Sequence, residues 1–259
     1  MSLLTWIIIF SLLGGVLSVI AASSFLLLPN KTRTGLIPHF VSFAIGALLG
    51  AAFLALIPHS LTGAHKLDVH HLGMTILLGL LAFFVMEKLV IWRHCHSDHC
   101  EAHPDHLDHG HQSAGTLVLI GDGLHNFIDG VLIAAAFMTD IHLGIVTSLA
   151  VATHEIPQEV GDFAVLLNSG FSRKKALLFN VLASLTTVVG ARLAYYSLSN
   201  LESYLPYVLA IAASSFIYIA VADLIPGLHK RTQLAAGFQQ MLLICAGVVV
   251  IFLAHSQLH

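Results

Sequence analysis

Long apolar runs alternate with short polar stretches along the whole chain. Each run contains about 20 or more residues, which is the length that an α-helix needs to cross the hydrocarbon core of a bilayer. The runs cover residues 3–28, 36–57, 72–92, 115–138, 143–167, 176–197, 206–226 and 234–255. We therefore expect an all-α integral membrane protein with eight transmembrane helices, folded as a single domain over residues 1–259.

The composition agrees with a location in the bilayer. Of the 259 residues, 57% are hydrophobic and only 10% are charged, and the mean hydropathy is +0.87. This is too little polar surface to cover a soluble globule. The near balance of 11 basic and 14 acidic residues gives no reason to expect a nucleic-acid partner. With 3 cysteines against 18 histidines, no disulfide framework is predicted, and histidine is the unusual feature.

Basic residues collect in every second connection between the runs. The even connections offer only Lys66, whereas the first, third, fifth and seventh connections contain the others: Lys31, Arg33, Arg93, Arg173, Lys174, Lys175, Lys230 and Arg231. Because cytoplasmic loops carry an excess of Lys and Arg, we expect the odd connections to be cytoplasmic. An even number of spans then places both termini outside, in a multi-pass protein of the plasma (bacterial inner) membrane.

Ionisable residues interrupt the middle of the fourth run. In the stretch Gly-Asp-Gly-Leu-His-Asn-Phe-Ile-Asp-Gly, His125 and Asp129 are four residues apart and Asp122 precedes His125 by three. On a helix these side chains share one face, with Asn126 beside it. An ionisable group at this depth costs about 2.5 kcal/mol or more. We therefore expect these residues to serve a function rather than packing.

The fifth run contains a second polar motif, His-Glu-Ile-Pro-Gln-Glu. His154 and Gln158 form one i,i+4 pair, and Glu155 and Glu159 form another. Pro157 lacks an N–H and predicts a kink with freed carbonyl groups. Imidazole, amide oxygen and carboxylate are together the ligands of a borderline divalent metal. The two stretches thus predict a metal site in the middle of the membrane.

The third connection, residues 94–112, is a polar tract rich in histidine and acidic residues. Its histidines are His94, His96, His99, His103, His106, His109 and His111. The tract has no apolar periodicity, so we expect a mobile cytoplasmic loop that binds metal weakly through several side chains. The alternative is a solvated linker without a metal-binding role.

A tripeptide repeat indicates an internal symmetry. Leu56-Ile57-Pro58 ends the second run and Leu224-Ile225-Pro226 ends the seventh, and the predicted topology runs these two spans in opposite directions. With three spans on each side of the central pair, this favours a 3+2+3 arrangement with inverted outer repeats, a plan common in secondary transporters. Asp223, just before the second tripeptide, is a possible accessory metal ligand, as is Asp122.

These motifs resemble the ZIP family of divalent metal transporters, in the branch with His-Asn-Phe-x-Asp-Gly in the fourth span and His-Glu-x-Pro-x-Glu in the fifth. The resemblance implies eight helices in a 3+2+3 fold, frequent homodimers, and an elevator-like motion of the helices that bear the site. It also implies a transport site for one or two metal ions, which maps onto His125, Asn126, Asp129, His154, Glu155, Gln158 and Glu159.

The chain departs from the branch at two places. Gln158 stands where a second histidine is common, and Ala51 and Ala55 stand where the second span commonly has an acidic residue and a histidine. An amide is a weaker ligand than an imidazole, which argues against a fully occupied two-metal centre. His59, just beyond Pro58, is a possible ligand at the entrance.

Two other functions fit parts of the sequence. An intramembrane zinc protease needs His-Glu-x-x-His, and position 158 is Gln. A metal sensor or storage protein could use the histidine-rich loop but needs no polar residues in two spans. We therefore predict a transporter and not an enzyme, which takes up Zn²⁺ into the cytoplasm. Fe²⁺, Mn²⁺ and Cd²⁺ are further candidate substrates, because affinity order alone does not set selectivity.

Overall fold

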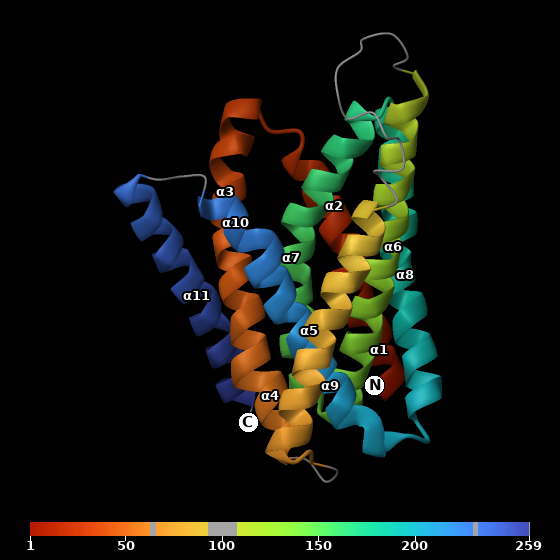
Figure 1. Cartoon of the computed structure of the whole chain (residues 1–259), viewed down its shortest axis with the longest axis vertical. Coiled ribbons are helices and arrows are strands. Elements are labelled where there is room, and N and C mark those ends of the chain that lie inside the picture. The colour runs from red at the N-terminus through yellow and green to blue at the C-terminus, as the bar shows by residue number, and fades with distance from the viewer. Residues whose placement is uncertain (63–65, 93–107, 230–232, 259) are drawn as a thin grey trace.

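All regular elements in the described part of the chain are helices (Figure 1). The computed structural model describes residues 1–62, 66–92, 108–229 and 233–258. The elements are α1 (Leu3–Gly14), α2 (Val16–Phe25), α3 (Asn30–Gly50), η1 (Ala51–Leu56), α4 (Ile57–Thr62), α5 (Val69–Trp92), α6 (Asp108–Thr139), α7 (Ile141–Asn168), α8 (Arg173–Leu198), η2 (Glu202–Tyr204), α9 (Leu205–Tyr218), η3 (Ile219–Leu224), α10 (Ile225–His229) and α11 (Leu234–Leu258). The expected all-α membrane fold is confirmed.

Seven helical segments among the described residues are long and apolar enough to cross a membrane. They correspond to seven of the eight predicted runs. The remaining run, 143–167, lies in α7, whose 28 residues give a length of about 42 Å. Its His, Glu, Gln and Asp residues lower its hydropathy, so α7 is not among the seven. The total of eight spans stays a prediction.

The long helices run up and down side by side, and both termini lie at the same end of the molecule (Figure 1). The opposite end carries the start of α3, with Lys31 and Arg33, and the turn between α7 and α8, which is followed by Arg173. The first and fifth connections, both expected to be cytoplasmic, thus lie at one end. We call it the basic end, and the other the terminal end.

Polar caps fix where several helices begin. The side chain of Asp140 accepts hydrogen bonds from the first N–H groups of α7, and Ser172 caps α8 in the same way. Before α5, the backbone N–H groups of His70 and His71 donate to Asp68. Because these bonds favour the ionised form, the pKa of the Asp68 carboxyl is lowered from its usual value.

The predicted helix over residues 3–28 is interrupted at Gly15. This residue has φ −85° and ψ −83°, outside the helical region. A Cβ atom at Gly15 would meet the Ser184 carbonyl oxygen of α8. The close approach of the two backbones therefore explains why a glycine stands at this position. The break at Gly15 divides the predicted first span into α1 and α2.

The two Leu-Ile-Pro tripeptides occupy equivalent positions in the structure. Each begins at the last residue of a six-residue π-helix, which is η1 at Leu56 and η3 at Leu224. The N–H of Ile57 bonds to the Ala52 carbonyl, and the N–H of Ile225 bonds to the Ala220 carbonyl. A proline ring clashes with the carbonyl four residues earlier, which a π-turn relieves. The segments run in opposite directions in Figure 1, as an inverted repeat requires.

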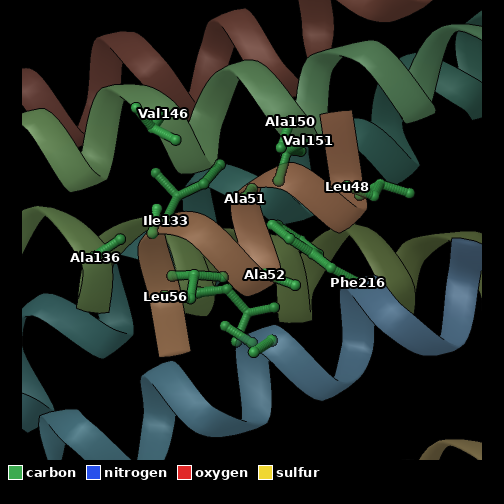
Figure 2. Packing of buried hydrophobic residues seen from close by; sticks show 14 of the residues in the cluster. Leu48, Ala51, Ala52, Leu56, Ile133, Ala136, Val146, Ala150, Val151 and Phe216 are labelled. Carbon is green, nitrogen blue, oxygen red and sulfur yellow. The ribbon is translucent and has the colours of Figure 1, made fainter. Parts of the chain in front are cut away.

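Small and branched apolar residues form one closely packed cluster between the site-bearing helices and their neighbours. Figure 2 shows its contributions from α3, η1, α6, α7 and α9. Ile133 and Val146 are 0% exposed, and Phe216 is 0% exposed. The members of the cluster on α6 follow Asp129, and the members on α7 precede His154. The cluster therefore lies between these two polar residues and the terminal end. We call it the apolar seal.

Glycines allow two helix pairs to approach closely. A Cβ at Gly130 of α6 would overlap the Thr187 carbonyl of α8, and a Cβ at Gly190 of α8 would overlap the Phe127 carbonyl of α6. Gly46 makes the same kind of contact with Ile244 of α11. The small-residue run around Gly46 therefore serves packing within the chain.

Most of the predicted histidine-rich loop lies outside the described residues. This holds for His94, His96, His99, His103 and His106. Helix α6 begins at Asp108, so the last residues of the predicted loop, 108–112, are helical. The expected role of the tract stays a prediction.

Candidate metal centre

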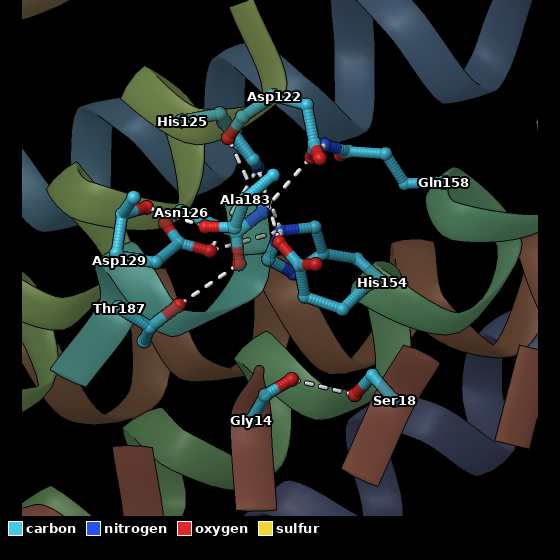
Figure 3. A network of polar contacts seen from close by, with 12 residues as sticks. Gly14, Ser18, Asp122, His125, Asn126, Asp129, His154, Gln158, Ala183 and Thr187 are labelled. Carbon is cyan, nitrogen blue, oxygen red and sulfur yellow. Dashed lines mark hydrogen bonds and ion pairs between the residues drawn. The ribbon is translucent and has the colours of Figure 1, made fainter. Parts of the chain in front are cut away.

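Four side chains from α6 and α7 converge near the middle of these helices, and Figure 3 shows three of them, His125, Asp129 and His154. They are His125, Asp129, His154 and Glu155. The Nε2 atoms of the two histidines lie 3.2 Å apart. Asp129 Oδ2 lies 3.7 Å from His125 Nε2 and 3.3 Å from His154 Nε2. Glu155 Oε1 lies 3.6 Å and 3.8 Å from the same two atoms.

These distances match the edges of a small tetrahedron. Zn²⁺ holds imidazole nitrogen and carboxylate oxygen at about 2.0–2.1 Å, which places tetrahedral ligands about 3.3 Å apart. Five distances between candidate ligand atoms of the cluster lie between 3.2 and 3.8 Å. The ligand type and the spacing both fit a four-coordinate divalent cation.

The carboxylates of this cluster are buried without hydrogen bonds. Asp129 and Glu155 are each 0% exposed, and none of their four side-chain oxygens has a hydrogen-bond partner among the described residues. A buried carboxylate without a partner is costly unless it is paired or binds a metal. With neutral imidazoles beside them, the two carboxylates are therefore unfavourable in the metal-free protein and become favourable when a cation is bound.

A backbone contact orients one of the imidazoles. His154 Nδ1 lies 3.2 Å from the carbonyl oxygen of Ala150, one turn earlier on α7. If Nδ1 carries the proton and donates it there, the lone pair of Nε2 faces Asp129 and His125. Metal-binding histidines are commonly fixed in this way.

Asn126, a predicted ligand, forms hydrogen bonds with two neighbouring polar side chains. Its side-chain oxygen accepts a hydrogen bond of 2.8 Å from Thr187 Oγ1, and its amide nitrogen donates to Asp122 Oδ1 at 2.9 Å. The residue is 0% exposed. In this conformation Asn126 ties α6 to α8, and its oxygen is occupied by Thr187.

A second group of acidic residues adjoins the first cluster. Asp122, Glu155 and Glu159 each offer an oxygen, and these oxygens lie within 4.8 Å of one another. Glu155 belongs to both groups. Gln158 Nε2 donates to Asp122 Oδ1 at 3.5 Å. The amide at position 158 thus turns its nitrogen toward a carboxylate.

A cavity of about 350 Å³ leads from the cluster toward the basic end. His125, His154 and Gln158 line its inner part, and Asp162 and Asp223 line it further along α7 and η3. On α6, α7 and η3 the lining residues beyond the histidines lie closer to the basic end (Figure 1). The apolar seal occupies the other side. This cavity therefore gives access to the cluster from the basic end.

Comparisons with known proteins agree with these observations. The family model described as ZIP Zinc transporter matches residues 92–255. This chain belongs to the ZIP family. Membership confirms the resemblance and places the chain among transporters rather than enzymes, so the intramembrane protease is not supported.

Several ZIP relatives are similar over most of the chain. Zinc transporter ZIP13 of Pongo abelii is 32% identical over 228 residues, covering 83% of this chain and 66% of the relative. Zinc transporter ZIP13 of Mus musculus is 29% identical over 261 residues, with 88% and 72% covered. Zinc transporter ZIP10 of Danio rerio is 39% identical over 158 residues, but these are 53% of this chain and 18% of that protein. The chain thus spans just under two thirds of the first relative and less than a fifth of the last.

The remaining predicted ligand of this ZIP protein lies apart from the cluster. His59 is on α4, near the terminal end, and its ring packs against His255 of α11 with centroids 5.3 Å apart. It is not among the described residues that line the cavity. His59 is therefore placed outside the centre.

One polar pair near the site was missed by sequence reasoning. The Tyr218 hydroxyl of α9 donates to Glu87 of α5, and both residues line a cavity of about 190 Å³ that also reaches His125 and Asp223. The signal was present, because Glu87 is an ionisable residue inside an apolar run. Thr187, the partner of Asn126, gave no such signal, since a threonine in a span is common.

Proposed function

We propose that this ZIP protein transports Zn²⁺ across a membrane, and that the ion passes through the cluster of His125, Asp129, His154 and Glu155. The observation that carries the proposal is the pair of buried carboxylates without hydrogen bonds at tetrahedral spacing from two imidazoles. The printed names of the ZIP13 relatives, which are zinc transporters, support the choice of ion.

The cluster suits a transported ion because its charges balance. Two carboxylates and two neutral imidazoles offset the charge of Zn²⁺, so the loaded site is neutral in a poorly hydrated interior. The ion would exchange its water ligands for these four groups. Mixed nitrogen and oxygen ligands also accept Fe²⁺, Mn²⁺ and Cd²⁺, so competition experiments belong to the test of selectivity.

The second acidic group extends this role. Asp122 lines the cavity, and Glu159 follows Glu155 by one turn of α7 toward the basic end. There they would receive the ion as it leaves the cluster or hold a second ion. Asp223 lines the same cavity and would attract cations along the way. These accessory roles are part of the proposal.

The one-sided cavity favours a direction. It opens toward the basic end, which the excess of Lys and Arg assigns to the cytoplasm, while the apolar seal closes the terminal end. The conformation is thus that of a carrier open to the cytoplasm. We propose inward transport, with both termini outside in the plasma or bacterial inner membrane.

The packing of the helices supports an elevator-like motion. The helices form two groups by their contacts. The first group contains α1, α2, α6, α7 and α8, which pack mainly against one another. The second group contains α3, which packs mainly against α11, and α5, which packs mainly against α9. The two groups meet more sparsely, chiefly where α3 contacts α7. In our proposal the first group of helices moves across the membrane and carries the cluster past the second group. The second group would stay in place and contact the other subunit of a homodimer.

Zinc flux into proteoliposomes tests the proposal. His154→Gln removes one imidazole from the cluster, and His142→Gln is a matched control near the start of the same helix. We expect His154→Gln to abolish Zn²⁺ flux and His142→Gln to keep it. Comparable flux in both variants, at equal reconstitution, would refute the role of the cluster. A wild-type protein without Zn²⁺ flux would refute the transport function.

A further inference from the structure

A chain of two hydrogen bonds joins α8 to the second acidic group (Figure 3). Thr187 Oγ1 donates to Asn126 Oδ1 at 2.8 Å, and Asn126 Nδ2 donates to Asp122 Oδ1 at 2.9 Å. Thr187 is 1% exposed, Asn126 is 0% exposed and Asp122 is 5% exposed. We call these three side chains the polar relay. Because the relay is buried, loss of one of its groups leaves the next one without a partner.

The chemistry of the three groups fixes the orientation of the amide. An ionised carboxylate accepts hydrogen bonds and cannot donate them, so Asp122 requires the amide nitrogen of Asn126. The amide oxygen then faces α8, where the Thr187 hydroxyl is a donor. Both ends of the amide are matched only in this orientation. Thr187 thus holds the oxygen of Asn126, which is the one atom of that side chain suited to bind a metal.

The relay leaves the two oxygens of Asp122 with different roles. Oδ1 accepts from Asn126 and from Gln158 Nε2. Oδ2 is buried and has no hydrogen-bond partner in the part of the chain that the structure describes. An oxygen of Asp122 also lies within 4.8 Å of oxygens of Glu155 and Glu159. The carboxylate is therefore held by one oxygen, and the other is left for a cation.

Another buried amide borders the same acidic group from α8. The side chain of Asn180 lies beside the Glu159 carboxylate and is 1% exposed. Its Oδ1 atom has no hydrogen-bond partner among the described residues. A buried polar oxygen without a partner is unfavourable, and a cation bound at the acidic group would supply one. Asn180 is uncharged, so this observation is independent of the carboxylates.

We propose that Thr187 is a positioning residue, which acts through Asn126 to hold Asp122 in a site for a hard divalent cation. The other members of this site are Glu155, Glu159 and Asn180. All of these ligands are oxygens, which suit Mn²⁺ better than an imidazole does. The proposal rests on the proposed function, in which the second acidic group receives or holds an ion beside the Zn²⁺ cluster.

Titration with Mn²⁺ measures binding at this site without a transport assay. The purified full chain in detergent first receives one equivalent of Zn²⁺, which fills the cluster of two histidines and two carboxylates. The electron paramagnetic resonance signal of free Mn²⁺ then gives the bound fraction. The test variant Thr187→Val keeps the shape of the side chain and removes the hydroxyl, and Thr187→Ser restores a hydroxyl.

The neighbouring threonine provides a matched control. Thr186 Oγ1 donates to the Gly123 carbonyl oxygen of α6 at 2.6 Å. Thr186→Val therefore also removes a hydrogen bond between α8 and α6, but it leaves the polar relay intact. A general loosening of these two helices would affect both valine variants, whereas a loss of positioning would affect only Thr187→Val.

We expect Thr187→Val to bind Mn²⁺ about tenfold more weakly than wild type, because loss of a group that orients a ligand costs about 10- to 100-fold in metal affinity. Thr186→Val and Thr187→Ser should bind like wild type. Equal affinities of Thr187→Val and Thr186→Val would overturn the proposal. So would weak binding by Thr187→Ser, or a wild-type protein that binds no Mn²⁺ after Zn²⁺ loading.

A double-mutant cycle shows whether Thr187 acts through Asp122. Asp122→Asn removes a ligand and should weaken Mn²⁺ binding by about 100-fold or more, and adding Thr187→Val should then change little. Two effects that multiply would overturn the proposed route. If Thr187→Val elutes as an aggregate in size-exclusion chromatography, the smaller Thr187→Ala takes its place with the same expectation. Zinc flux is measured separately, so a wild type that binds both ions but moves neither would refute transport and not the role of Thr187.

Discussion

Replacing Asp129 by asparagine should weaken zinc binding and stabilise the metal-free protein at the same time. The change keeps the shape of the side chain and removes one of the two carboxylates in the cluster. Asp129 is 0% exposed, and neither of its oxygens has a hydrogen bond among the described residues. A carboxylate buried in this way is unfavourable in the absence of metal, and the uncharged amide relieves that cost.

The magnitudes follow from the geometry. Loss of a partner outside the ligand shell costs about 10- to 100-fold in metal affinity, so loss of a direct ligand should cost at least about 100-fold. At a zinc concentration of about 100 times the wild-type dissociation constant, bound zinc adds about 2.7 kcal/mol to wild-type stability but only about 0.4 kcal/mol to Asp129→Asn. Without metal, the variant should gain about 1 kcal/mol or more.

Thermal unfolding in detergent, with and without Zn²⁺, measures both effects. Asp140→Asn is the matched control, because it removes a carboxylate at the start of α7, where asparagine is an equally good N-cap. We expect the control to keep the wild-type response to zinc. A zinc-induced shift in Asp129→Asn that equals the wild-type shift would refute the assignment of Asp129 as a ligand.

Three further results are expected. Gly190→Ala places a methyl group against the Phe127 carbonyl and should cost about 1–3 kcal/mol, seen as a lower melting temperature, whereas Gly161→Ala meets open space and should not; equal melting temperatures would contradict the close contact of α6 and α8. Gln158→His should raise the preference for Zn²⁺ over Mn²⁺ in competitive flux, and an unchanged ratio at normal expression would mean that this side chain does not reach the ion. Cysteines at either terminus should react with an impermeant reagent from outside, and one within residues 94–111 should not; the reverse pattern would invert the proposed direction.

Much of the architecture could be predicted from the sequence because the bilayer imposes a simple rule. Every backbone polar group in a span must be satisfied internally, so long apolar runs become helices. The break at Gly15 could not be predicted, since it depends on a contact with Ser184 in a distant part of the chain. The π-helices before Pro58 and Pro226 could not be predicted, because the repeated tripeptide indicated an internal symmetry and no local backbone structure.

The candidate site was predictable to the extent that it rests on local spacing. His125 and Asp129 were expected on one helical face, and the structure places them beside His154 and Glu155. Periodicity gives no distance between two helices, so the division into two groups with Glu155 in common could not be predicted. Nor could the bond between Asn126 and Thr187, which depends on the packing of α6 against α8.

Anomalous scattering at the zinc absorption edge, from crystals of the zinc-loaded protein, tests the central claim most directly. The account predicts a strong peak between α6 and α7, about 2.0–2.1 Å from the Nε2 atoms of both His125 and His154. A weaker second peak near Asp122 and Glu159 would agree with a second ion. Zinc found only on the histidines of residues 94–111, with no peak at the cluster, would contradict the account.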